Sequence, residues 1–154
     1  MVRLITASIV LSLIAPIAVR AQLKIRVSPQ HSKPYQKIDA TIENTSNRPI
    51  TFCIEIGQTS PKGDGEMEAT PSPFWVQRND NGKWGTLLIG PDVGSFRVAQ
   101  ELEDGKSLDF PFRLGATGKM RLRLKYWRGS IANFDCHAPP KHSKLVTSSA
   151  FTID

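Results

Sequence analysis

Residues 49–57 read PITFCIEIG, and apolar side chains occupy every second position of this stretch. Isoleucine or phenylalanine stands at 50, 52, 54 and 56, with Thr51, Cys53 and Glu55 between them. This alternation has the period of a β-strand, whose successive side chains point to opposite faces. The stretch therefore predicts a strand with one buried face. It also places the thiol of Cys53 on the polar face, although cysteine is among the residue types most often buried.

The same period of two recurs along the chain, and no helical period of 3.6 extends over a useful length. About seven or eight short strands separated by turn residues predict an all-β domain, an immunoglobulin-like antiparallel β-sandwich. A closed barrel is the alternative from the same pattern. The expected strands lie at 23–27, 38–42, 50–56, both arms of a hairpin over 74–84, 87–89, 96–98, 108–112, 120–127 and 150–153. Asn81-Gly82 is the pair that a type I′ turn prefers, and long loops are expected at 57–73 and 129–144.

The first 21 residues have the features of a secretory signal peptide. Arg3 precedes the apolar run LITASIVLSLIAPIAV at 4–19, and Val19 and Ala21 are small or compact residues at the positions a signal peptidase reads. Cleavage after Ala21 leaves one domain at 22–154 in a secreted or periplasmic protein, with no membrane span. The alternative is an uncleaved anchor, but the run is shorter than the ~20 residues that a spanning helix needs.

The charge of the chain is only mildly basic. Removal of Arg3 and Arg20 with the signal lowers the net charge from +6 to +4. A nucleic-acid-binding protein would carry a denser cluster of Lys and Arg. No nucleic acid is therefore expected as a partner.

Two cysteines, Cys53 and Cys136, remain in the mature chain. An even number of cysteines in an oxidising compartment predicts a disulfide. A cysteine on the outer face of a strand is well placed to hold a loop that crosses the sheet, and Cys136 lies in such a loop. Two free thiols, or a metal-binding or catalytic cysteine, are the competing interpretations.

A row of cations is expected on the last long strand. Arg121, Arg123 and Lys125 alternate with apolar residues and lead to Trp127. Side chains two apart in a strand project from one face about 7 Å apart, so the row can hold an acidic polymer or a carboxylate-rich partner. The alternative is a solvated face that keeps the sheet from aggregating. Trp75, Trp84 and Tyr126 are expected mainly in the core.

The loop at 129–144 is the other candidate binding region. Ile131 and Phe134 are apolar residues that either dock on the sheet or meet a partner. A disulfide would restrain this loop and lower the entropy that it loses on binding. Cys136, His137 and His142 lack the spacing of a metal site, and no nucleophile motif is present. We therefore expect no enzyme activity, no metal and no cofactor.

Four segments occur in an order that resembles a known family. They are IDATIENTSNRPITF at 38–52, FWVQRNDNGKW at 74–84, LEDGKSLDFPFRL at 102–114 and GKMRLRLKYW at 118–127. Together they resemble the bacterial Ig-like domains and the related intracellular proteinase inhibitor (BsuPI) family over 23–127. The resemblance implies a β-sandwich, and it raises inhibition of a proteinase as a function.

Two functions follow as hypotheses. The first is an exported, non-catalytic Ig-like module that binds a protein or a component of the cell envelope. The alternative is a proteinase inhibitor that presents the 57–73 or the 129–144 loop in extended form. The sequence indicates no oligomeric state.

Overall fold

The computed structural model describes residues 23–56, 59–61, 67–69, 71–87 and 96–154. Every regular element in these residues is a β-strand, as the alternation predicts. The strands are Leu23–Ser28 (β1), His31–Ser32 (β2), Lys37–Asn44 (β3), Ile50–Ile56 (β4), Thr59–Pro61 (β5), Met67–Ala69 (β6), Phe74–Asp80 (β7), Lys83–Thr86 (β8), Phe96–Leu102 (β9), Ser107–Arg113 (β10), Gly118–Arg128 (β11), Lys144–Thr147 (β12) and Phe151–Ile153 (β13). Within the described ranges, no helix is long and apolar enough to cross a membrane.

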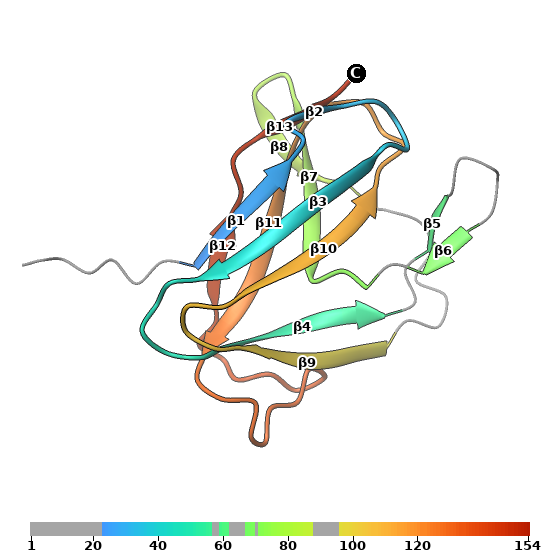
Figure 1. Cartoon of the computed structure of the whole chain (residues 1–154). Coiled ribbons are helices and arrows are strands. Elements are labelled where there is room, and N and C mark those ends of the chain that lie inside the picture. Colours follow the sequence, from blue (N-terminus) through green and yellow to red (C-terminus); the bar gives the residue numbers. More distant parts are fainter. Residues whose placement is uncertain (1–22, 57–58, 62–66, 70, 88–95) are drawn as a thin grey trace, which may run out of the picture.

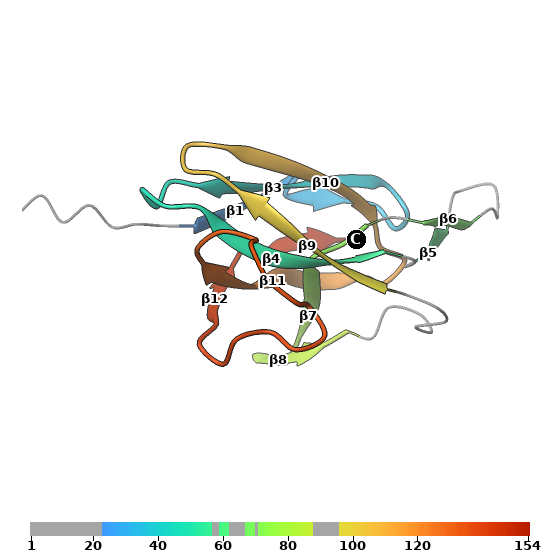
Figure 2. The same cartoon turned by 90° about the horizontal axis from the view of Figure 1, so that it is seen from below.

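Two sheets pack as a sandwich, and Figure 2 shows their layers edge-on. The first sheet has the strand order β1-β3-β10, and both of its pairings are antiparallel. The second has the order β2-β13-β11-β4-β9, with β7, β8 and β12 attached through β11 and β7 (Figure 1). A separate ribbon of β5 and β6 lies at one end.

The core lies between the sheets and is built from the alternating apolar positions. The ring of Phe110 on β10 lies 6.2 Å from that of Phe52 on β4 and 5.7 Å from that of Phe74 on β7, both edge-on. Ile38 and Ile42 of β3 face this layer with no exposed surface. Such edge-to-face pairs add stabilisation beyond the area that they bury. The inward phase predicted for 50–56 is confirmed, because Ile50, Phe52 and Ile54 are all buried.

The turn chemistry also behaves as expected. Asn81 and Gly82 both have positive φ, 54° and 86°, as a type I′ turn requires between β7 and β8.

Pro111 lies on β10, which pairs with β3 alone within the described part of the chain. Proline is tolerated on such an edge strand because its missing N–H interrupts no ladder.

The strand list departs from the prediction in three places. The expected loop at 57–73 contains the short β5–β6 ribbon, and the expected loop at 129–144 ends at the start of β12. Leu87 lies outside any strand, and the rest of the strand expected at 87–89 falls outside the described residues, as does the signal at 1–21. The short strands β2, β5, β6 and β12 were missed because each has only two to four residues, too few for a period to show.

β11 organises the second sheet. It is 11 residues long and pairs along one edge with β13 and then β12. Along its other edge it pairs with β7 at Met120–Leu124 and with β4 at Tyr126–Arg128. The strands β4 and β7 therefore lie along the same edge of β11, one near each end of it, with a fork between them. One face of this sheet packs on the core, and the other face is turned away from it. This face is called the outer face below.

Candidate binding surface

The outer face of β11 carries Arg121, Arg123 and Lys125, which together are called the basic row. All three side chains are partly buried, while the residue before each of them, Met120, Leu122 or Leu124, is fully buried in the core. The long stems of Arg and Lys cover the sheet while the charged ends reach water. The predicted placement of the row on one face is therefore confirmed.

Neutral side chains hold two members of the basic row. Arg121 Nε donates a hydrogen bond of 2.9 Å to Gln77 Oε1, and its Cζ lies 4.2 Å from the ring centroid of Trp84. Lys125 Nζ lies 5.3 Å from the ring centroid of Trp127. Cation–π contacts of this kind fix a cation without neutralising it.

Other cations of the chain are held by carboxylates instead. Arg26 pairs with Glu43 at 2.9 Å, Lys37 with Asp39 at 3.1 Å and Arg78 with Asp80 at 2.9 Å. In the described ranges, no ion pair involves a member of the basic row. The row therefore keeps its positive charge uncompensated by contact within this part of the molecule.

Arg123 lies at the centre of the row, opposite Trp75 of β7 and Thr147 of β12 in the strand register. Its Nε is buried and has no hydrogen-bond partner. A buried donor without a partner costs stability, and few such groups occur in native proteins.

The tryptophans of this face are arranged differently from the expectation. Trp75 was expected in the core, but its side chain is 48% exposed, because Phe74 and Val76 take the inward positions of β7. Trp84 is partly buried and also lies on the outer side, against Arg121. Tyr126 alone of the three is a core residue, at 9% exposure.

Trp127, which was expected beside the cations, is buried at 6% exposure by the 129–143 segment. The ring of Phe134 packs edge-on against it at 4.9 Å, and Trp127 Nε1 donates a 2.7 Å hydrogen bond to the carbonyl of Pro140. Phe134 therefore docks on the sheet. Ile131 remains 39% exposed, and its backbone N–H donates to the Glu101 carboxylate at 2.6 Å.

A disulfide pins the same segment to β4. The sulfur atoms of Cys53 and Cys136 lie 2.15 Å apart and their Cα atoms 5.8 Å apart. The disulfide that the two cysteines predict is therefore present. This bond explains why a cysteine stands on the outer face of β4: it holds a crossing segment instead of filling the core. Nearby, Thr51 Oγ1 donates to the carbonyl of Gly129 at 2.8 Å.

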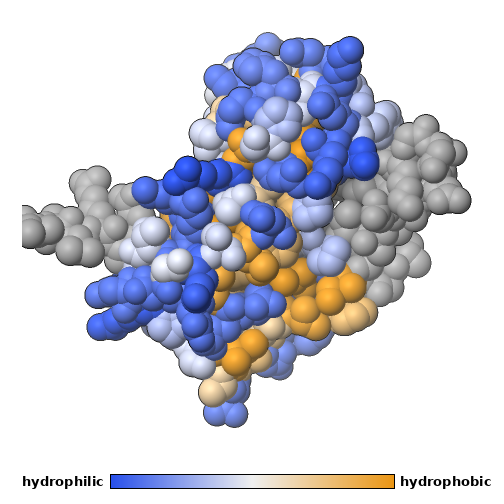
Figure 3. Space-filling view, viewed as in Figure 1, coloured by the Kyte–Doolittle hydropathy of each residue, from blue (hydrophilic) through white to orange (hydrophobic). Residues whose placement is uncertain are grey.

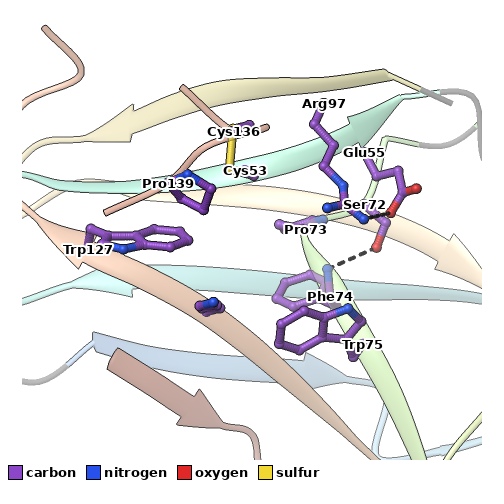
Figure 4. Close-up of a pocket in the computed structure, with 11 residues that line it drawn as sticks. Cys53, Glu55, Ser72, Pro73, Phe74, Trp75, Arg97, Trp127, Cys136 and Pro139 are labelled. Carbon is purple, nitrogen blue, oxygen red and sulfur yellow. Dashed lines mark hydrogen bonds and ion pairs between the residues drawn. A yellow bond between two sulfur atoms is a disulfide. The ribbon is translucent and has the colours of Figure 1, made fainter. Parts of the chain in front are cut away.

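A small pocket lies in the fork between β4 and β7, and it is called the fork pocket below (Figure 4). Phe74 and Trp75 form one side, and Trp127, Pro139 and the disulfide form the other. Its volume is about 120 Å³. Lys125 also lines it, so the pocket is continuous with one end of the basic row.

The polar rim of the fork pocket contains both signs of charge. Glu55 and Arg97 are cross-strand neighbours on β4 and β9, with Arg97 Nη2 3.9 Å from Glu55 Oε2. The Glu55 side chain is 17% exposed and that of Arg97 52%. Backbone hydrogen bonds of 3.0 Å in both directions between Glu55 and Ser72 tie β4 to the segment that leads into β7. The sequence analysis did not predict that the fork pocket is lined by Trp75, Glu55 and Arg97. The alternation of β7 could have shown that Trp75 points outward.

A second exposed surface is apolar and lies over β4 and β9 beside β10, where Figure 3 shows hydrophobic side chains gathered. Phe96 of β9 is 55% exposed there, and its register partner Ile56 is partly buried. Phe96 points to the opposite side of β9 from Arg97, away from the fork pocket.

No group of three or more His, Cys, Asp or Glu side chains that could hold a metal occurs among the described residues.

No protein-family model matches the chain, and no curated protein and no solved structure matches it either. The geometry of the outer face is therefore the basis on which a function can be assigned.

Proposed function

We propose that this chain is an exported, non-catalytic Ig-like β-sandwich that binds an anionic partner of the cell envelope on the outer face of β11. The observation that carries the proposal is that neutral side chains, Gln77, Trp84 and Trp127, hold Arg121 and Lys125 of the basic row. A row that served only for solubility would gain nothing from being held in place.

Preorganisation is the physical reason why such a row favours binding. A long charged side chain loses about 0.5–1.5 kcal/mol of conformational freedom when a ligand immobilises it. Contacts with Trp84 and Gln77 have already removed part of that freedom from Arg121. An incoming anion therefore meets two cations, Arg121 and Lys125, whose side chains are already positioned by neutral neighbours.

Export is supported by two independent features. The apolar segment at 4–19 predicts a signal peptide. The Cys53–Cys136 disulfide suits an oxidising compartment, because cytosolic reductants keep most thiols reduced.

Retention on a carboxylated matrix tests the proposal. We expect retention of the mature protein at low ionic strength and release by salt, because exposed charges are screened over about 10 Å at 0.1 M salt. The double variant Arg121→Gln with Arg123→Gln should weaken binding about tenfold, since each exposed charge contact contributes up to ~1 kcal/mol. Lys24→Gln with Arg26→Gln removes equal charge from β1 of the other sheet and should change binding little. Equal losses in both double variants would show that only the net charge matters.

Proteinase inhibition is the second proposal, and it rests on the family resemblance. An inhibitory loop must present an extended backbone, whereas the 129–143 segment turns back on itself through hydrogen bonds such as Phe134 N–H to the Ile131 carbonyl. The disulfide and the Glu101 contacts hold the segment against the sheet. Incubation with a panel of secreted proteinases tests this function, and absence of stoichiometric inhibition would remove it.

A further inference from the structure

We infer that the anionic partner is a polysaccharide that carries carboxylates, and that the fork pocket binds one of its sugar rings while the basic row binds its acidic groups. The inference rests on the proposed function of the outer face and deepens it. It follows from three features of the fork pocket: its flat apolar walls, its mixed polar rim and its continuity with the row.

The walls of the fork pocket suit a ring with apolar faces. Trp75 presents an indole that is 48% exposed, and Pro139 and Trp127 stand opposite (Figure 4). A sugar ring carries C–H groups on its faces and hydroxyls on its edge, so it can stack on a flat aromatic surface while its edge remains free to hydrogen-bond. At about 120 Å³ the pocket is smaller than sites for whole drug-sized ligands, which measure about 300–1,000 Å³, so its occupant is no larger than a single ring of a polymer.

The rim of the pocket offers acceptors and donors side by side, which is what hydroxyl groups require. The Glu55 carboxylate is an acceptor, and the Arg97 guanidinium and the Lys125 ammonium are donors. The Arg97–Glu55 pair at 3.9 Å brings the two kinds of group within reach of one ligand. Ser72 Oγ accepts a 3.2 Å hydrogen bond from the Phe74 N–H, and its own O–H can donate to a ligand.

Glu55 argues against two other polyanions. A strand of acidic peptide or a polyphosphate would bring its own negative charge to the pocket, and like charges at contact distance repel. A ring of an acidic polysaccharide carries one carboxylate, which can lie toward Lys125, together with neutral hydroxyls, whose hydrogen bonds to the Glu55 carboxylate are charge-assisted. A pocket for a purely charged polymer would gain from a neutral residue at position 55.

Continuity with the row gives the polymer a path. Lys125 lines the fork pocket and is the first cation of the row, and Arg123 and Arg121 follow on the same face of β11. Successive cations are about 7 Å apart along the strand. A chain with one ring in the pocket can therefore place the carboxylates of later sugars on the row.

Three polymers separate the contributions of sugar and charge. Polygalacturonate has sugar rings and carboxylates, its methyl ester has the rings without the charge, and poly-L-glutamate has the carboxylates without the rings. We expect polygalacturonate to bind the mature protein at least about tenfold more tightly than either of the others at equal monomer concentration. Titration calorimetry measures all three with one protein sample.

Variants in the pocket provide the second arm of the test. Trp75→Ala should weaken binding of polygalacturonate about tenfold and leave poly-L-glutamate unchanged, since the indole supplies stacking only. Phe96→Ala is the matched control, because it removes an equally exposed aromatic ring from outside the pocket and should stay within about twofold.

Glu55→Gln gives changes of opposite sign. Loss of a negative charge should strengthen poly-L-glutamate binding about twofold, whereas loss of a charge-assisted acceptor should weaken polygalacturonate binding about threefold. Circular dichroism checks that each variant is folded, and the three-polymer comparison on the unaltered protein stands even if one variant is not.

The outcomes distinguish the two proposals. Equal binding of poly-L-glutamate and polygalacturonate, lost in the basic-row double variant, would overturn the sugar pocket and keep the anion-binding face. Binding of the methyl ester as tight as that of polygalacturonate would overturn the role of the row. Failure of both polyanions to bind would overturn the proposed function itself.

Discussion

The buried amide of Asn44 connects two turns at one end of the sandwich. Its Nδ2 donates hydrogen bonds of 2.8 Å to the carbonyls of Arg48 and Leu102, and its Oδ1 accepts from the backbone N–H and the hydroxyl of Ser46. The residue has no exposed surface. One side chain therefore fastens the β3–β4 turn to the end of β9, and through it one sheet to the other.

Replacement of Asn44 by Ala should lower the free energy of unfolding by roughly 2–4 kcal/mol, because it leaves buried carbonyls without donors. Denaturant titration followed by tryptophan fluorescence measures the change. Asn133→Ala is the control, since Asn133 is an exposed loop residue with positive φ and should cost about 1 kcal/mol or less. Equal effects of the two substitutions would contradict the role of the Asn44 hydrogen bonds.

For single residues, the sequence predicts whether a side chain points into the core or outward better than it predicts which residues that side chain contacts. The phase of Ile38, Ala40 and Ile42 continues inward to Asn44, and the phase of Phe74 and Val76 turns Trp75 outward. Neither phase reveals that Asn44 reaches Leu102, or that Glu55 meets Arg97, because those partners come from strands distant in the sequence.

The 129–143 segment is the element that completes the candidate site. The disulfide, the Pro140 carbonyl and the Glu101 carboxylate hold it over Trp127 and beside the fork pocket. The sequence predicts the disulfide from two cysteines and the outer face of β11 from its alternation. It does not predict that the segment covers Trp127, because an irregular segment has no period from which its course can be inferred.

Removal of the disulfide by Cys53→Ser with Cys136→Ser should destabilise the protein by about 4 kcal/mol, since the bridged residues are 83 positions apart. Part of the effect should be local. With the segment loosened, Trp127 becomes exposed, and we expect a red shift of tryptophan emission before global unfolding. Trp127→Phe in the same background identifies the emitting residue, and an unchanged spectrum on loss of the disulfide would contradict the covering role of the segment.

At the scale of the whole molecule, two sheets enclose one core, which is one of the two arrangements, sandwich or barrel, that the binary pattern allows. The class of fold and most long strands were correctly predicted, because alternation over five or more residues is a strong signal. The attachment of β7, β4, β12 and β13 to the single strand β11 was not predicted. Strand order depends on which distant segments pair with each other. The alternation of apolar residues identifies each strand but not its partners.

Export is a prediction about the entire chain. Expression of the full sequence in a bacterial host should give a protein in the extracytoplasmic fraction that begins at Gln22 and contains no reactive thiol. Mass spectrometry with and without an alkylating probe measures both properties together. A full-length protein in the cytoplasm with two alkylated cysteines would contradict the assignment.

The position of β11 in the chain has a consequence for how the protein assembles. The strands β4 and β7 are joined in one sheet by β11, which is synthesised after both. Cys136 follows later still. β4 can pair with β9 and β7 with β8 before β11 is made, but these two pairs join into one sheet only when nearly the whole domain is present. Until then the edges of β4 and β7 that contact β11 stay unpaired. Such dependence on distant pairing slows folding and leaves nascent strands open to aggregation, so a helper that shields them would raise the yield of native protein.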